Sequence, residues 1–170
     1  MDNIEIIPLE GIKFNDVTIP LSASRKDVES LLGVPYGRHE NSLFYFHNEL
    51  RFDFDNNDRV TFIEFLAGID GNIQPKIYGV YAFQTEADQL YNILSEKNRG
   101  DIDDHENGYC YGFLNISVGV FRPSIPEDIQ KMIANAAADG EPMEADEIEY
   151  EMRTANYWAT IGIGIENYYR

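Results

Sequence analysis

Cysteine is almost absent from this chain of 170 residues, which contains Cys110 alone. A single cysteine excludes an internal disulfide and a zinc site built from four thiolates, and it fits a reducing compartment. The sequence also lacks any run of eighteen apolar residues and has no basic leader followed by an apolar stretch. We therefore expect neither a membrane-spanning helix nor a signal peptide, and predict a cytoplasmic protein.

Basic residues are scarce as well, with 13 Lys and Arg against 30 Asp and Glu and a formal net charge of −17. The window from Gly100 to Glu151 holds thirteen acidic residues, and its only cations are Arg122 and Lys131. A concentrated negative field attracts cationic surfaces and repels nucleic acid. The composition therefore predicts a basic protein partner, and neither nucleic acid nor a membrane as a partner.

The charge does not make the chain disordered, because 44% of its residues are hydrophobic and it contains 11 Tyr and 10 Phe. Disordered acidic segments have few aromatic residues. A chain of this length buries roughly two thirds of the surface that its unfolded form exposes. We expect one globular domain over residues 1–170.

Compact catalytic motifs are missing too, since the sequence contains neither a glycine-flanked serine elbow nor a Walker loop. Cys110 has only the three histidines His39, His47 and His105 as potential bases. The carboxylates that follow residue 100 would raise the pKa of its thiol and so oppose reactivity. We expect an inert cysteine and a protein that is not an enzyme and uses no cofactor.

Two patterns resemble ligand sites without completing them. Asp53, Asp55, Asn57 and Glu64 match ligand positions of a calcium loop, but Asp58 stands where that loop needs glycine. The aromatic alternation around them is typical of a β-hairpin, which we predict instead. The acidic loop 101–106 offers carboxylates to a hard cation, but charge runs are usually solvated, and we predict no metal site.

The first part of the chain predicts one helix and three strands. Ser24 and Asp27 have the spacing of a capping box, and Gly33 and Pro35 end the helix that we expect over 25–32. Aromatic-rich runs then predict strands. These strands are expected at 43–46, 50–54 and 59–66.

The second part shows the same order. A strand-like run covers 76–83, Thr85 and Asp88 repeat the cap spacing, and a helix is expected over 86–97. Strands are then expected at 109–113, 116–121 and 157–165. The Gly162-Ile163-Gly164 pattern in the last of them predicts a strand closely approached by other atoms. Before that strand comes an insertion, 125–156, in which we expect a helix beginning near Pro126 and another over 144–153.

We therefore predict an α+β fold with a largely antiparallel sheet and helices on one face. The order of the elements is compatible with two β-α-β-β-β units. The units would be residues 11–68 and 76–165, with the helical insertion in the second and a boundary at 68–71. A true duplication and a coincidence of element order are both compatible with the sequence.

The acidic window coincides with the two segments that interrupt this repeat, the loop 100–108 and the insertion. Binding residues are often carried by such segments on a rigid scaffold, and aromatic residues within a charged rim are typical of interfaces. A solvated face that serves solubility is the alternative. The partner-binding residues that we predict are Asp101, Asp103, Asp104, Glu106, Tyr109, Glu144, Asp146, Glu147 and Tyr150.

Residues 22–66 resemble a small bacterial repeat domain. The run Leu31-Leu32-Gly33-Val34-Pro35, followed by Leu50-Arg51-Phe52-Asp53-Phe54, is similar to the helix, turn and hairpin pattern in the outer-membrane assembly lipoprotein and the beta-lactamase inhibitor protein. The chain lacks the signal peptide and the lipidated cysteine of that lipoprotein. An envelope role is therefore not expected.

As a type, a small acidic α+β protein without catalytic motifs resembles the immunity proteins of bacterial polymorphic-toxin and contact-dependent inhibition systems. This resemblance implies a non-enzymatic protein that binds a basic toxin domain, often a nuclease, and masks its active site. A general protein-interaction module without a toxin, and a divergent hydrolase or metal-binding protein, are the alternatives.

Overall fold

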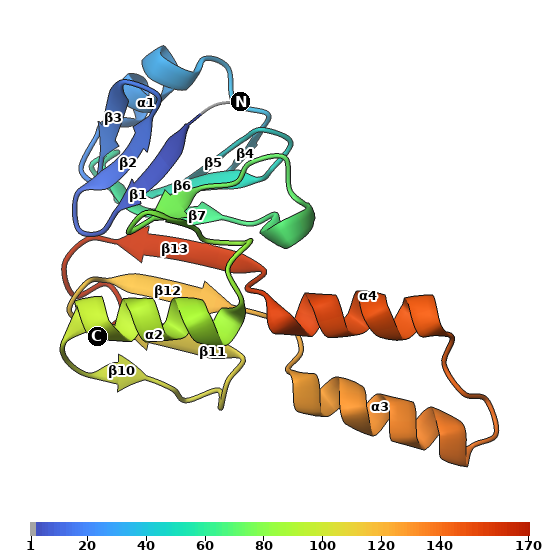
Figure 1. The fold of residues 1–170 in the computed structure, drawn as a ribbon. Coiled ribbons are helices and arrows are strands. Elements are labelled where there is room, and N and C mark those ends of the chain that lie inside the picture. The colour runs from blue at the N-terminus through green and yellow to red at the C-terminus, as the bar shows by residue number, and fades with distance from the viewer. Residues whose placement is uncertain (1–2) are drawn as a thin grey trace.

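The computed structural model describes residues 3–170, which form two sheets and four α-helices (Figure 1). The smaller sheet has five strands in the order β3-β2-β1-β8-β9. Its strands are β1 (Ile4–Ile7), β2 (Gly11–Phe14), β3 (Val17–Pro20), β8 (Lys76–Ile77) and β9 (Val80–Tyr81). Only the β1–β8 pair is parallel.

The larger sheet has eight antiparallel strands in the order β10-β11-β12-β13-β7-β6-β5-β4. One half consists of β4 (Gly37–His39), β5 (Ser42–Tyr45), β6 (Leu50–Phe54) and β7 (Val60–Phe65). The other consists of β10 (Ile102–Asp103), β11 (Cys110–Phe113), β12 (Val118–Phe121) and β13 (Thr160–Gly164). The two halves meet where β7 pairs with β13, near the centre of the sheet. The α+β fold with a largely antiparallel sheet, as predicted, is confirmed.

Each half of the large sheet follows a helix in the sequence, α1 (Arg25–Leu32) or α2 (Ala87–Asn98). Both helices and the small sheet contribute to one hydrophobic cluster, together with one face of the large sheet. Val28 of α1, Leu90 of α2 and Ile12 of β2 are all buried in it. Apolar residues of β6, β7 and β13 that pair across the sheet complete the cluster. They lie on one side of the sheet because alternate residues of a strand point to the same side. We call this side of the large sheet its inner face.

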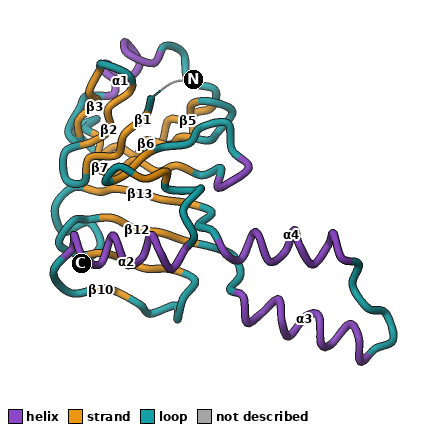
Figure 2. Tube along the Cα trace, viewed as in Figure 1, coloured by secondary structure: helices purple, strands orange, loops and turns teal. Residues whose placement is uncertain are grey.

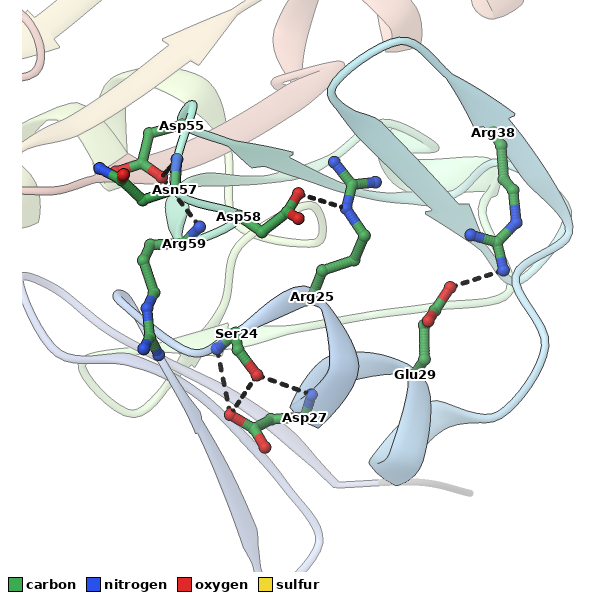
Figure 3. Close-up of polar contacts among 9 residues, drawn as sticks. All are labelled: Ser24, Arg25, Asp27, Glu29, Arg38, Asp55, Asn57, Asp58 and Arg59. Carbon is green, nitrogen blue, oxygen red and sulfur yellow. Dashed lines mark hydrogen bonds and ion pairs between the residues drawn. The ribbon is translucent and has the colours of Figure 1, made fainter.

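The start of α1 is the predicted capping box (Figure 3). The Ser24 hydroxyl accepts from the Asp27 backbone N–H at 3.1 Å, and the Asp27 carboxylate accepts from the Ser24 backbone N–H at the same distance. These bonds satisfy donors at a helix end that have no partner within the helix. Nearby, Arg25 pairs with Asp58 in the β6–β7 turn, where the Asp55 carboxylate accepts from the backbone N–H groups of Asn57 and Arg59 (Figure 3). The hairpin predicted here in place of a calcium loop is therefore present.

Three local predictions were wrong. The run 76–83 is not one strand, because Tyr78 and Gly79 both have positive φ and turn the chain between β8 and β9. Thr85 does not cap α2, since its hydroxyl donates to the carbonyl of Tyr81 and the helix begins at Ala87. The sheet also gains strands that we did not predict, β4 and β10 at its two edges, so each helix is followed by four strands instead of three.

The insertion forms a helical hairpin of α3 (Pro126–Ala138) and α4 (Ala145–Asn156), and the 3₁₀ turn η1 (Gly68–Asp70) lies near its base. The hairpin projects sideways from the sheets (Figures 1 and 2). Within the two helices only Ile129 and Ala155, both toward the base, are buried. The chain therefore combines a packed body with an exposed arm, to which we refer as the acidic hairpin, residues 126–156.

Candidate functional site

Most of the predicted partner-binding residues are exposed, but they form two groups. Asp101, Asp103, Asp104 and Glu106 lie on and beside β10, in the loop that precedes β11. Glu144, Asp146 and Glu147 lie at the start of α4, at the tip of the acidic hairpin. Since α4 has twelve residues, about 18 Å of helix separates this tip from the hairpin base. The structure therefore does not bring the predicted residues into one compact patch.

The first group lies on a loop that is held firmly at its start by Asn98, the last residue of α2, which is only 2% exposed. Its amide nitrogen donates to the carbonyls of Gly100 and Asp101 at 2.9 and 3.0 Å. Its amide oxygen accepts from the backbone N–H groups of Asn115 and Ile116. Because all these groups are partly or wholly buried, Asn98 fixes where the acidic loop leaves the body.

Within the loop, the carboxylates make contacts of their own. The His105 ring and the His105 backbone N–H both bond to the Asp103 carboxylate, and these bonds lower the pKa of Asp103. The Asp104 carboxylate accepts from the backbone N–H of Gly108. Asp101 and Glu106 are exposed at the surface. Two of the four carboxylates, those of Asp103 and Asp104, are thus held by hydrogen bonds within the loop.

Tyr109 joins this loop to the acidic hairpin. Its hydroxyl donates to the carboxylate of Asp128 in the first turn of α3, which also accepts from the Ile125 backbone N–H at 3.3 Å. The hydrogen bond from Tyr109 lowers the pKa of Asp128 and raises that of Tyr109 itself. The Tyr109 hydroxyl is therefore engaged within the protein and holds the hairpin base against the loop.

Arg122, which the sequence offered only as one of two cations in the acidic window, is the central residue of this base. It is 7% exposed, and its guanidinium donates to the carbonyls of Gly108 and Ala155 at 2.9 and 2.8 Å. The same group lies 4.9 Å from the centre of the Trp158 ring, whose N–H bonds to the Ala87 carbonyl. Two N–H groups of the Arg122 guanidinium therefore bond to backbone carbonyls. The surrounding surface carboxylates are not neutralised by it.

Acidic residues suit the beginning of α4. Asp146 and Glu147 lie in its first turn and Glu144 is its N-cap residue, close to the positive end of the helix dipole. This interaction offsets part of the repulsion expected among the closely spaced carboxylates of α4. At the other end, Arg153 pairs with Asp70 of η1 at 3.0 Å and so fastens the hairpin to the body.

Tyr150 is the one aromatic residue in the sequence of the acidic hairpin, and 54% of its surface is accessible. It borders a cleft of about 130 Å³ between α4 and η1, which Thr154 and Tyr157 also line. The Arg153 guanidinium lies 5.9 Å from the Tyr150 ring. Tyr109 and Tyr150 are the two aromatic residues that we predicted to bind a partner. Of these, Tyr150 is the exposed one.

Cys110 is partly buried and has carboxylates nearby. Burial, followed by the charges of Glu106 and Asp103, raises the pKa of its thiol, which opposes thiolate chemistry. His105, the nearest histidine in sequence, bonds to Asp103. Across residues 3–170, no three His, Cys, Asp or Glu side chains lie close enough together to hold a metal ion.

Comparison with known proteins found no matching family model, no matching curated protein and no matching solved structure. Among the residues described, no helix is both long and apolar enough to cross a bilayer. Fold and surface therefore define the class of this protein as an acidic α+β protein with an exposed helical arm.

Proposed function

We propose that this chain is a non-enzymatic binding protein that neutralises a basic toxin domain, in the manner of bacterial immunity proteins, and acts in the cytoplasm. The observation that carries the proposal is the acidic hairpin. Its residues 126–156 hold nine carboxylates against Lys131 and Arg153, and Arg153 is already paired with Asp70. An arm with such a charge suits the cationic groove with which a nuclease holds its substrate.

The hairpin also carries exposed apolar side chains, which supply the binding energy that charge alone does not. Tyr150 and Met132 are 54% and 39% exposed, and Tyr150 lies between the carboxylates of Glu149 and Glu151. Interfaces draw most of their binding energy from a few large side chains, whereas charged rims increase the association rate and the specificity. We therefore assign anchoring to Tyr150 and steering to the acids of the hairpin tip.

The attachment of the arm also supports a binding role. Arg122, the Tyr109–Asp128 hydrogen bond and the exposed Arg153–Asp70 ion pair each join the base of the hairpin to the body. A rigidly mounted element loses less conformational entropy when it binds than a loose one does. The carboxylates of the loop 101–106 lie beside this base and would extend the contact.

The proposal is tested with the product of the gene directly upstream, which should be a toxin with a basic effector domain. The triple variant Glu144→Gln, Asp146→Asn and Glu147→Gln removes three charges from the hairpin tip. We expect its association rate constant at low salt to fall at least about tenfold, and the loss to shrink as salt shortens the screening length. Stopped-flow fluorescence measures both effects.

A matched control removes three exposed charges from the small sheet through Glu5→Gln, Glu10→Gln and Asp16→Asn. This control should change the rate constant by less than about threefold, because its charges lie on other elements. Equal losses in the two variants would contradict the hairpin as the binding surface. Binding of a neighbour that has no toxicity would instead favour the general interaction module.

A further inference from the structure

The side of the large sheet opposite the inner face carries a second feature, a pocket of about 300 Å³. Arg51, Glu64, Gly162 and Gly119 are direct partners in a row across β6, β7, β13 and β12. Strand alternation places this row opposite buried residues such as Ile63. We call this side of the sheet the outer face.

Glycines on the outer face make room for an aromatic ring beside the pocket. The Tyr169 ring occupies the space that a Cβ atom on Gly119 would fill, and it also lies against Gly162 and Gly112. The ring of Tyr168 stacks on Phe62 with centroids 4.6 Å apart and planes 4° apart. Two aromatic residues that follow β13 thus cover the outer face.

Phe121 also borders the pocket. This residue of β12 is 39% exposed, and it lines the same cavity as Tyr168, Tyr169, Thr160 and Glu64. With Phe62, the pocket therefore has four aromatic side chains among its lining groups, together with one carboxylate, Glu64, and one guanidinium, Arg51. Aromatic faces attract cations through the negative potential of their π-systems.

Carboxylates outnumber cations in the group of charged residues at and beside the pocket. Arg51 pairs with Asp53 at 2.9 Å and with Glu64 at 3.2 Å, so one guanidinium serves two carboxylates. The Ser42 hydroxyl donates to Asp53 at 2.6 Å but adds no charge. The Arg51 guanidinium already lies 5.4 Å from the Phe62 ring, which shows that the face accommodates a cation against an aromatic ring. Arg51 and Glu64, which line the pocket, balance each other, so the one negative charge in excess belongs to the group of three that Asp53 completes beside the pocket.

Burial makes this excess costly. It raises the pKa of Glu64 although Arg51 and a hydrogen bond from Thr160 act in the opposite direction, and the neighbouring Asp53 raises it further. The side chain of Glu64 is 17% exposed. Burial is the largest cause of the raised pKa values of Tyr168, Tyr169 and Cys110, and the charge of Glu64 raises all three further. An additional cation would relieve this partly desolvated carboxylate.

We propose that the pocket binds an organic cation, an alkylammonium or alkylguanidinium group, with Glu64 as its counter-ion and Phe121, Tyr168 and Tyr169 as its aromatic walls. An anionic ligand would be repelled, and a neutral one would gain no Coulomb attraction. The pocket shares no residue with the acidic hairpin, so this proposal stands independently of the proposed function.

The test is a titration of the full chain at pH 7 and low salt with butylammonium, butylguanidinium and, as a neutral analogue, butanol. NMR spectra should show shifts confined to Glu64, Thr160, Phe121, Tyr168 and Tyr169 for the cations. We expect both cations to bind at least tenfold more tightly than butanol. Whichever cation binds more tightly identifies lysine-like or arginine-like ligands as the preferred source.

Two variants make the test specific. Glu64→Gln should weaken cation binding at least tenfold, whereas Glu149→Gln, which removes an exposed charge from α4, should change it less than twofold. Phe121→Leu leaves the ion pairs intact and should weaken binding severalfold, so that the proposal stays testable if Glu64→Gln fails to fold. Equal affinity for butanol and the cations, or unchanged affinity in both pocket variants, would overturn the proposal.

Discussion

The ring of Tyr169 lies where a Cβ atom of Gly119 would be, so this glycine and this tyrosine fit only as a pair. Gly119 stands between Gly112 and Gly162 on neighbouring strands, and the three leave a strip of bare backbone on the outer face. The Tyr169 ring fills this strip and is partly buried there. The residues after β13 are therefore an integral part of the sheet packing.

Gly119→Ala should lower the free energy of unfolding by about 2 kcal/mol, because the added methyl group forces the Tyr169 ring out of its position. Urea unfolding measures this loss. In a Tyr169→Ala background the same substitution should cost less than about 0.5 kcal/mol. Gly37→Ala is the control, since its Cβ atom would come no nearer than 3.2 Å to another group. An equal cost in both backgrounds would rule out Tyr169 as the cause.

Arg122→Met should destabilise the protein by about 3 kcal/mol, because the buried carbonyls of Gly108 and Ala155 lose their donors. Hydrogen exchange should also become faster in the last turn of α4. Lys131→Met, on the exposed side of α3, should change stability by less than about 0.5 kcal/mol. Unchanged exchange in α4 would show that Arg122 does not hold the hairpin base.

Asn98→Ala should cost about 2 to 3 kcal/mol, since it leaves four backbone groups without their side-chain partner. Thermal unfolding measures the loss. Asn98→Asp should be at least as harmful, because a carboxylate cannot donate to the carbonyls of Gly100 and Asp101. Asn135→Ala, on the exposed surface of α3, is the matched control. A loss no greater than that of the control would contradict the anchoring role of Asn98.

The stability contributed by Glu49 should depend on pH. Burial alone would raise the pKa of this carboxyl group, but hydrogen bonds from Asn72 and Ile73 outweigh it and lower the pKa. A lowered pKa in the folded state means that the contribution is present at neutral pH and is lost as the pH falls through that value. Wild type should therefore exceed Glu49→Gln in melting temperature at pH 7. The difference should shrink below about pH 4. A difference independent of pH would show that the ionised form is not the stabilising one.

Local sequence signals located the central elements well. The capping box at Ser24 and the glycine at Gly33 predicted α1 with its observed bounds, and the prediction for α2 differed by one residue at each end. These signals succeed because caps and amphipathic faces depend on residues a few positions apart. The close approach predicted at Gly162 and Gly164 is also confirmed, by Tyr168, Tyr169 and Phe62.

The missed elements include short strands that pair with the next strand of the chain, β1 with β2, β4 with β5 and β10 with β11. β1, β4 and β10 have four, three and two residues, which is too few for an alternation pattern to be distinctive. The turn between β8 and β9 contains Tyr78 at positive φ, a conformation that tyrosine seldom adopts and that the sequence did not signal. β4 and β10 are edge strands that pair with one neighbour each, whereas β1 is the central strand of the small sheet.

By itself, the sequence determined the acidic character of the chain, the helical nature of residues 126–156 and the α+β class, because charge and periodicity are properties of neighbouring residues. Only the tertiary structure decided that β7 and β13 meet at the centre of the large sheet, that Arg122 lies buried beneath the hairpin, and that Glu64 shares a pocket with Tyr168 and Tyr169. It also divided the predicted acidic surface into two groups, one in the loop 101–106 and one at the tip of the acidic hairpin. These relationships join residues up to about a hundred positions apart, and side-chain packing, which no local pattern encodes, selects among the many ways of bringing them together.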